Sequence, residues 1–278
     1  MTLKTLLLSF LTTCTAHSAV AQTLGGVEYS PKATTFHITT SPDVKKVNVL
    51  LSDTDSDDPT EQLTKQMKRV GAGKWELTVK SDLKGKYYLF SVYNSAQPDN
   101  TPGIFAKAVG VNGKRGAIVD LRDTAPEGWA DDVRPALSNP CDLVIYEMHH
   151  RDFSVDLSSG LKNKGKYLAL TEPKAIEHLQ CLGVNAVHIL PSFDYASVDE
   201  SKPDVPQYNW GYDPLNYNVP AGSYSTAAAT PTTRIREFKQ MVQALHRAGI
   251  RVILDVVDSH PFDINGSNFQ KTYPDYFY

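Results

Sequence analysis

The chain has 278 residues, of which 41% are apolar and 21% charged, with 17 glycines and 17 prolines. These proportions are typical of globular proteins and exclude collagen-like, low-complexity and intrinsically disordered chains. The formal net charge of −3 provides no basic excess for binding nucleic acid or an anionic membrane surface. The length predicts about two domains, each large enough to bury a core.

The N-terminal residues 1–21 are typical of a signal peptide. Lys4 precedes an apolar run at residues 6–11, and Ala-Val-Ala at residues 19–21 matches the small-x-small pattern of a cleavage site. Lipoprotein anchoring through Cys14 is less favoured, because the preceding Leu-Thr-Thr is a poor match to a lipidation motif. No later stretch reaches the ~18–20 apolar residues of a transmembrane helix. We therefore expect a secreted or periplasmic protein without a transmembrane segment.

Two cysteines remain after the expected cleavage, Cys141 and Cys181. Neither has a partner at the spacing of a zinc site, and two cysteines do not make a disulfide framework. Cys181 lies in a helical pattern, where we expect it to be a small buried residue.

Residues 22–111 show the short alternating patterns of an all-β module. Strands are predicted at residues 34–38, 47–51, 75–79 and 87–93. Short strands separated by turns predict a small β sandwich. Trp75 alternates with polar neighbours, so we expect it in the core rather than on a ligand-binding surface.

An acidic stretch, Asp-Thr-Asp-Ser-Asp-Asp, occupies residues 53–58. It has the acidity of a calcium-binding loop but lacks the glycine and the closing glutamate of an EF-hand. We favour a solvated turn.

After a linker at residues 112–141, residues 142–278 alternate between strand and helix patterns. Strands are predicted at residues 143–146, 185–190 and 251–257. The first helix is predicted to be capped by Thr171, to bury Ile176, Leu179 and Leu182, and to stop at Gly183. The second is predicted to begin at Pro231 and to stop at Gly249, with Ile235, Phe238, Met241, Val242 and Leu245 at helical spacing. This alternation predicts a parallel sheet with crossover helices.

Parallel strands place functional residues in the loops at their carboxyl ends. Within the loop after the second strand, residues 207–224 interleave aromatic rings with amides and carboxylates. This composition suits a sugar, whose C–H face stacks on rings and whose hydroxyls bind polar groups. It equally suits a long loop that packs on its own aromatic residues.

The remaining polar candidates follow the first and third strands. Asp255 ends an apolar run, so it needs a partner, which could be a ligand hydroxyl, an arginine or a metal. A metal cluster with Asp258 and His260 is the least favoured option, because their spacing specifies no metal. For His149 and His150 we favour a hydrogen-bonded loop network over a metal site.

Four segments together resemble the type I pullulanases of the α-amylase family, glycoside hydrolase family 13. They are residues 106–113, residues 143–154, the Tyr-Asn-Trp-Gly-Tyr-Asp-Pro run at 208–214 with its continuation at 222–226, and residues 255–260. The resemblance implies a starch-binding-like β sandwich followed by the first three strands of a (β/α)8 TIM barrel. It also implies an α-glucan substrate, hydrolysed at α-1,6-glucosidic bonds with retention of configuration.

The resemblance assigns roles to residues of this chain. Tyr212 would stack on the glucosyl ring at the cleavage subsite, with Trp210 and Asp213 beside it. Asp255 would orient the groups around the catalytic carboxylate, and His260 would hydrogen-bond the same sugar. No metal ligand is assigned. Ser259 stands where the family has asparagine, which leaves calcium as the one open cofactor.

The family's catalytic carboxylates follow its fourth, fifth and seventh barrel strands, beyond residue 278. The predicted barrel portion, residues 143–278, is also much shorter than a complete barrel, which has about 250 residues. We therefore expect this chain to be an N-terminal fragment without a catalytic residue, inactive alone and with a poorly folded barrel portion. Two alternatives remain, a non-catalytic α-glucan-binding protein and the functionless product of a disrupted coding region.

Overall fold

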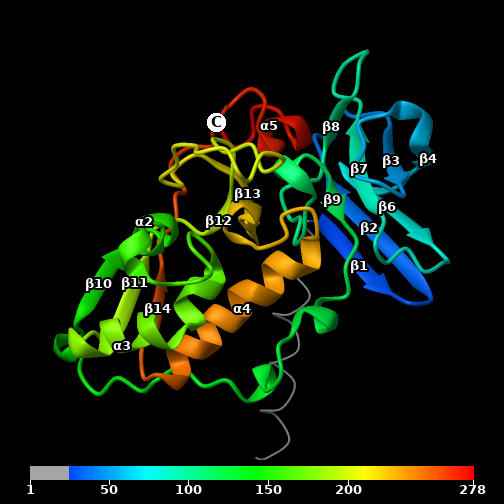
Figure 1. Cartoon of the computed structure of the whole chain (residues 1–278). Helices are drawn as coiled ribbons and strands as arrows, with labels where there is room; N and C mark the ends of the chain where they lie inside the picture. Colours follow the sequence, from blue (N-terminus) through cyan, green and yellow to red (C-terminus); the bar gives the residue numbers. More distant parts are fainter. Residues whose placement is uncertain (1–24) are drawn as a thin grey trace, which may run out of the picture.

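The computed structural model describes residues 25–278 (Figure 1). The predicted signal peptide, residues 1–21, and Cys14 lie outside this range. Within it, no helix has both the length and the apolar character needed to cross a membrane.

The N-terminal part consists of two antiparallel sheets that share one core. The first sheet has the order β1 (Gly25–Ser30), β2 (Ala33–Thr39), β6 (Lys74–Val79) and β5 (Lys68–Gly71). The second has the order β4 (Gln62–Gln66), β3 (Val47–Ser52), β7 (Tyr87–Val92) and β8 (Asp99–Thr101), with β9 (Gly116–Ala117) also paired to β7. Phe36 and Trp75 from the first sheet pack with Val49 and Phe90 from the second. Apolar side chains on facing sheets thus bury one another, as in a β sandwich.

Trp75 lies in this core, as its alternating position predicts. Its side chain is 4% exposed, and its indole Nε1–H donates a hydrogen bond of 3.0 Å to Thr40 Oγ1. Burial with a satisfied N–H excludes Trp75 from any exposed sugar-binding surface.

Of residues 112–141, predicted as a linker, the start contributes β9 to the sandwich, and the part from Asp123 to Asp132 packs along the helix α4 (Pro231–Arg247) (Figure 1). The short 3-10 turns of this region are η2 (Val111–Gly113), η3 (Leu121–Thr124), η4 (Trp129–Asp131) and η5 (Pro140–Asp142). Lys239 Nζ donates to Thr124 Oγ1 at 2.8 Å, and His246 Nδ1 lies 2.7 Å from Asp132 Oδ2. Polar side chains of the helix therefore hold this segment.

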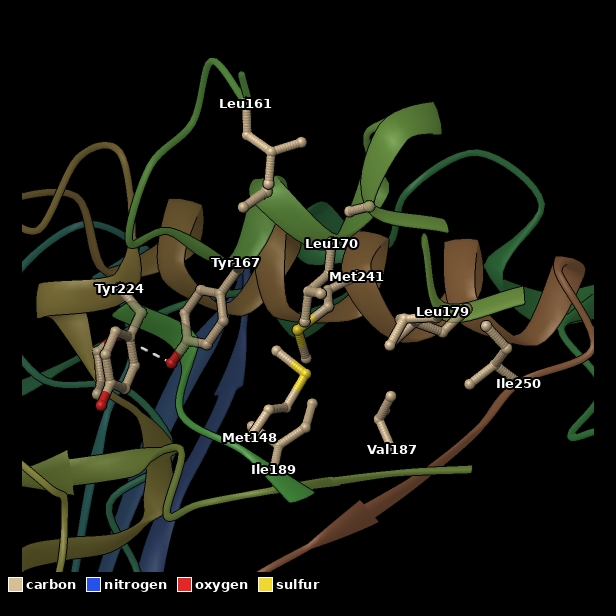
Figure 2. Packing of buried hydrophobic residues seen from close by; sticks show 14 of the residues in the cluster. Met148, Leu161, Tyr167, Leu170, Leu179, Val187, Ile189, Tyr224, Met241 and Ile250 are labelled. Atoms are coloured by element: carbon tan, nitrogen blue, oxygen red, sulfur yellow. Dashed lines mark hydrogen bonds between the residues drawn. The ribbon is translucent and has the colours of Figure 1, made fainter. Parts of the chain in front are cut away.

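A three-stranded parallel sheet follows, with the order β10 (Ile145–Met148), β11 (Ala186–Ile189) and β14 (Arg251–Leu254). The connecting helices α3 (Pro173–Cys181) and α4 cover one face, where Met148, Val187, Leu179 and Met241 pack together (Figure 2). An antiparallel ribbon, β12 (Phe193–Tyr195) and β13 (Pro214–Pro220), lies between this sheet and the sandwich (Figure 1). The short helices α2 (His150–Ser154) and α5 (Asn268–Thr272) and the 3-10 turns η1 (Pro59–Glu61), η6 (Leu157–Ser159), η7 (Tyr167–Thr171) and η8 (Gly222–Tyr224) complete the elements. The predicted parallel sheet is present; closure into a barrel stays a prediction.

The first crossover helix differs from its prediction in its N-terminal cap and in the exposure of Leu182. It begins at Pro173 after Glu172, whereas the Thr171 hydroxyl donates to Leu168 O at 2.8 Å within η7, so Thr171 is no helix cap. Leu182 follows the last helical residue and is 52% exposed. Gly183 ends the helix as predicted, with a φ of +72° that other residues rarely adopt.

The prediction that Cys181 is buried is wrong, because its side chain is exposed. The buried positions of α3 are Ala175 and Leu179. A residue two places after Leu179 is rotated by roughly 200° around the helix axis, which turns Cys181 toward solvent.

Tyr167 provides a test of this core. It is fully buried, its hydroxyl lies 3.0 Å from the carbonyl oxygens of Ser192 and Ala221, and its ring packs edge-on against Tyr224 (Figure 2). Tyr167→Phe is expected to lower the free energy of unfolding by about 1–2 kcal/mol, the cost of a lost buried hydrogen bond. Urea denaturation measures this, with Tyr276→Phe on the surface as the control. An unchanged midpoint in Tyr167→Phe would contradict the prediction.

Candidate functional site

The candidate site lies at the carboxyl ends of the three parallel strands. The Tyr212 hydroxyl donates a hydrogen bond of 2.5 Å to Asp255 Oδ2. The same carboxylate oxygen lies 3.6 Å from His188 Nε2, and His188 Nδ1 lies 3.5 Å from Glu147 Oε2. Four polar side chains therefore form a chain, Tyr212–Asp255–His188–Glu147.

Strand register explains this arrangement. Glu147 of β10 is paired with His188 of β11, which is paired with Ile253 of β14. Asp255 follows two residues later, so its side chain lies on the same face of the sheet as Ile253. Met148 and Val187 alternate with the polar pair and enter the helix-covered core. The polar residues consequently occupy the face that the helices leave open.

His260 contacts the backbone of Tyr212. Its Nε2 lies 3.0 Å from the backbone oxygen of Tyr212, and its Nδ1 lies 3.0 Å from Ser259 Oγ. A carbonyl oxygen only accepts, so Nε2 is the donor of this hydrogen bond. Ser259, which stands where the family pattern has asparagine, thus contacts the histidine ring directly.

Burial and the Asp255 carboxylate together raise the pKa of Tyr212 to about 12. The phenol therefore stays neutral and remains a hydrogen-bond donor at physiological pH. The Asp255 side chain is 22% exposed. One carboxylate oxygen is bound to Tyr212, and its other oxygen has no hydrogen bond from the described part of the chain, which leaves it available to a ligand hydroxyl.

Trp210 extends the site with an exposed aromatic surface. Its side chain is 59% exposed, and its ring centroid lies 5.8 Å from that of Tyr212 in an edge-on geometry. Tyr208 continues the row, with its ring 6.4 Å from Trp210. In contrast, Tyr224 is fully buried and Asn209 donates to its hydroxyl at 2.9 Å. Residues 207–224 therefore include rings packed into the core, as a self-packed loop predicts, and exposed rings, for which sugar binding stays a prediction.

Asp213 does not join the cluster. Its Oδ1 accepts a hydrogen bond of 3.2 Å from Ser197 Oγ, and its Oδ2 is buried without a hydrogen-bond partner in the described residues. Among the residues predicted for the site, the structure brings together Tyr212, Trp210, Asp255 and His260. Asp213 is adjacent in sequence, but its carboxylate is turned toward Ser197.

The predicted histidine network after β10 is present. His149 Nδ1 accepts from the backbone N–H of Arg151 at 3.1 Å, and its Nε2 lies 3.0 Å from the Tyr224 hydroxyl. Burial lowers the pKa of His149, which keeps it neutral and able to accept. The described residues contain no group of three or more His, Cys, Asp or Glu side chains arranged to hold a metal ion.

Sequence reasoning missed Glu147 and His188 as parts of the site. Glu147 directly follows the strand predicted at residues 143–146, whereas His188 lies inside the strand predicted at 185–190. A usable signal existed for His188, since strands of parallel sheets are normally continuous apolar runs and this residue interrupts one.

The chain is similar to several pullulanases, although no protein-family model matches it. It is 45% identical to the pullulanase of Bacillus subtilis over 224 residues, which cover 77% of the chain and 30% of that protein. It is 31% identical to pullulanase 1 of Arabidopsis thaliana over 281 residues, covering 84% and 28%. The structure of Paenibacillus barengoltzii pullulanase with maltohexaose and alpha-cyclodextrin superposes with a TM-score of 0.85 and 45% identity, covering 90% of this chain and 40% of that one.

The chain thus spans 28–40% of the length of these relatives. The superposition covers nine-tenths of the chain. Over the residues shared with these relatives, the chain belongs to the pullulanase family.

Proposed function

We propose that this chain provides α-glucan binding to a secreted debranching enzyme that hydrolyses α-1,6-glucosidic bonds with retention. The observation that supports this best is the hydrogen-bonded pair Tyr212–Asp255, flanked by the exposed ring of Trp210 and by His260. An aromatic face beside a carboxylate and an imidazole matches the C–H face and hydroxyl rim of a glucosyl unit. The P. barengoltzii relative was solved with maltohexaose.

Each residue has a distinct role in this proposal. The ring of Tyr212 stacks on one glucosyl unit, and its bond to Asp255 fixes the angle of the ring. Asp255 accepts a sugar hydroxyl with its second oxygen, and Trp210 contacts the next sugar along the chain. His260 approaches the same glucosyl unit as Tyr212, and Asp213 supports the backbone beside them.

Hydrolysis with retention needs a nucleophilic carboxylate and an acid/base carboxyl group about 5–5.5 Å apart. The family resemblance places these groups after later barrel strands than the three in this sheet. We therefore propose that residues 1–278 alone bind α-glucan without cleaving it. The alternative is a non-catalytic protein that binds glucan through the same cluster. The two proposals differ only in whether the whole protein hydrolyses glucan.

Calorimetric titration of the chain with maltohexaose tests the binding site. Tyr212→Ala is expected to weaken binding by about tenfold or more, because it removes a stacking ring at the centre of the site. Tyr276→Ala, which removes a 66% exposed ring elsewhere, should leave the affinity unchanged. Equal affinities for Tyr212→Ala and the unmodified chain would refute the site.

Reducing-end release from pullulan separates binding from catalysis. The purified chain is expected to release no reducing ends, and neither should Tyr212→Ala. Release by the unmodified chain that disappears in Tyr212→Ala would overturn the binding-only proposal, since contaminating amylase would act equally in both samples.

A further inference from the structure

Residues 196–213 form the loop that holds Trp210 and Tyr212. Among the described residues, its hydrogen bonds to the N-terminal half of the chain are made by Asn112. Asn112 Oδ1 accepts a hydrogen bond of 2.7 Å from the backbone N–H of Glu200, and Asn112 Nδ2 donates to Asp199 Oδ1 at 3.0 Å. The backbone N–H of Asn112 donates to Glu200 Oε2 at 2.9 Å. One residue thus makes three hydrogen bonds to two consecutive residues 87 and 88 positions away.

The backbone of Asn112 has a conformation that few residue types adopt. Its φ of 58° and ψ of 21° lie in the left-handed region, where asparagine is among the few side chains tolerated. The neighbouring Gly110 and Gly113 allow close approach on both sides, because a Cβ on either would overlap the carboxylate of Asp55 or Asp194. The turn is therefore built for contact with both halves of the molecule.

The acidic stretch of the sandwich, residues 53–58, makes hydrogen bonds and ion pairs with this turn. Asp55 Oδ2 accepts a hydrogen bond of 2.6 Å from the backbone N–H of Val111. Asp57 pairs with Lys114 at 3.1 Å and with the buried Arg115 at 3.5 Å. A stretch that composition alone assigns to a solvated turn is thus a contact surface between the sandwich and residues 111–115.

We propose that Asn112 is a positioning residue that couples the β sandwich to glucan binding through the loop at residues 196–213. By fixing Asp199 and Glu200, it holds the loop from which Trp210 and Tyr212 reach the sugar. Preorganised loops bind more tightly, because less conformational freedom is lost when the ligand arrives. The inference rests on the proposed function for its ligand but not for the loop contact itself.

The test is Asn112→Gly, which keeps the left-handed backbone and removes only the side-chain bonds. Hydrogen exchange should accelerate by roughly tenfold or more at the amides of residues 199–208, with exchange in the sheet core unchanged. Affinity for maltohexaose should fall about fivefold or more. Asn100→Gly, at an exposed position of β8, is the matched control and should show neither effect.

The outcomes separate the two proposals. If the unmodified chain does not bind maltohexaose, the proposed function fails, and hydrogen exchange alone decides whether Asn112 positions the loop. If the chain binds but Asn112→Gly binds equally well, the coupling is overturned. Asp199→Ala, which removes one partner from the loop side, repeats the test should Asn112→Gly not fold.

Discussion

Replacing Arg234 with methionine is expected to lower the free energy of unfolding by about 3–5 kcal/mol, as for other broken buried ion pairs. Arg234 is fully buried, with its Nη2 3.1 Å from Glu200 Oε2 and its Nη1 3.5 Å from Asp194 Oδ1. Its Nη2 also donates to the carbonyl of Gly110 at 3.3 Å. Methionine fills similar space but leaves two buried carboxylates without their cation.

The loss should be larger at pH 8 than at pH 6. Burial, then the nearby Glu200 charge, raise the pKa of Asp194 to about 7 against the opposing guanidinium. An acid with a raised folded-state pKa loses stability as pH rises from its unfolded value, about 4, toward that pKa. In Arg234→Met the pKa of Asp194 rises further, because the guanidinium no longer lowers it. The variant therefore continues to lose stability at pH values where the unmodified chain no longer does.

Urea denaturation at both pH values measures this effect. Arg236→Met, at an exposed position of the same helix, should change the free energy by no more than about 0.5 kcal/mol. A small loss for Arg234→Met that does not depend on pH would show that the carboxylates find other partners.

The chain is expected to lose about 2–3 kcal/mol of stability between pH 7 and pH 4.5 through His150. This side chain is completely buried, and desolvation, then the neighbouring His149, lower its pKa to about 3. Its Nε2 lies 3.0 Å from Ser192 Oγ, whereas Nδ1 has no hydrogen-bond partner in the described residues. Below pH 6.5, His150 binds a proton in the unfolded chain but stays neutral in the folded chain. The free energy of unfolding therefore decreases as pH falls.

His150→Gln removes the titrating group and should flatten this part of the stability profile, although its stability at pH 7 is lower. His178→Gln, at an exposed position, is the matched control and should keep the original slope. Denaturant titrations from pH 4.5 to pH 7 measure both. A His150→Gln profile as steep as that of the unmodified chain would assign the acid sensitivity to other groups.

Alternation in the sequence identified the central strands of the sandwich but not its edges. Strands β2, β3, β6 and β7 match the predicted positions, because their side chains alternate or are buried against the opposite sheet. Strand β5 has four exposed residues and β4 is mostly exposed, so neither leaves a period-two pattern. Strands β4 and β5 form because they pair with β3 and β6, and this pairing cannot be seen in their own sequence.

For the site, the sequence could identify residue types but not the direction of side chains. Tyr212, Asp255 and His260 follow strand ends and converge, as expected for loops at one edge of a parallel sheet. The direction of the Asp213 side chain depends on Ser197, 16 residues away. The contact between Asn112 and Glu200 spans 88 residues and leaves no local pattern.

The hydrogen bond between His260 and Tyr212 has a consequence for how this surface can change. The imidazole binds the backbone oxygen of Tyr212, not its phenol, so any side chain at position 212 preserves the contact. The shape of the aromatic surface and the contact of the imidazole therefore depend on different atoms of Tyr212. A substitution of the ring can change the aromatic surface without rebuilding the histidine beside it.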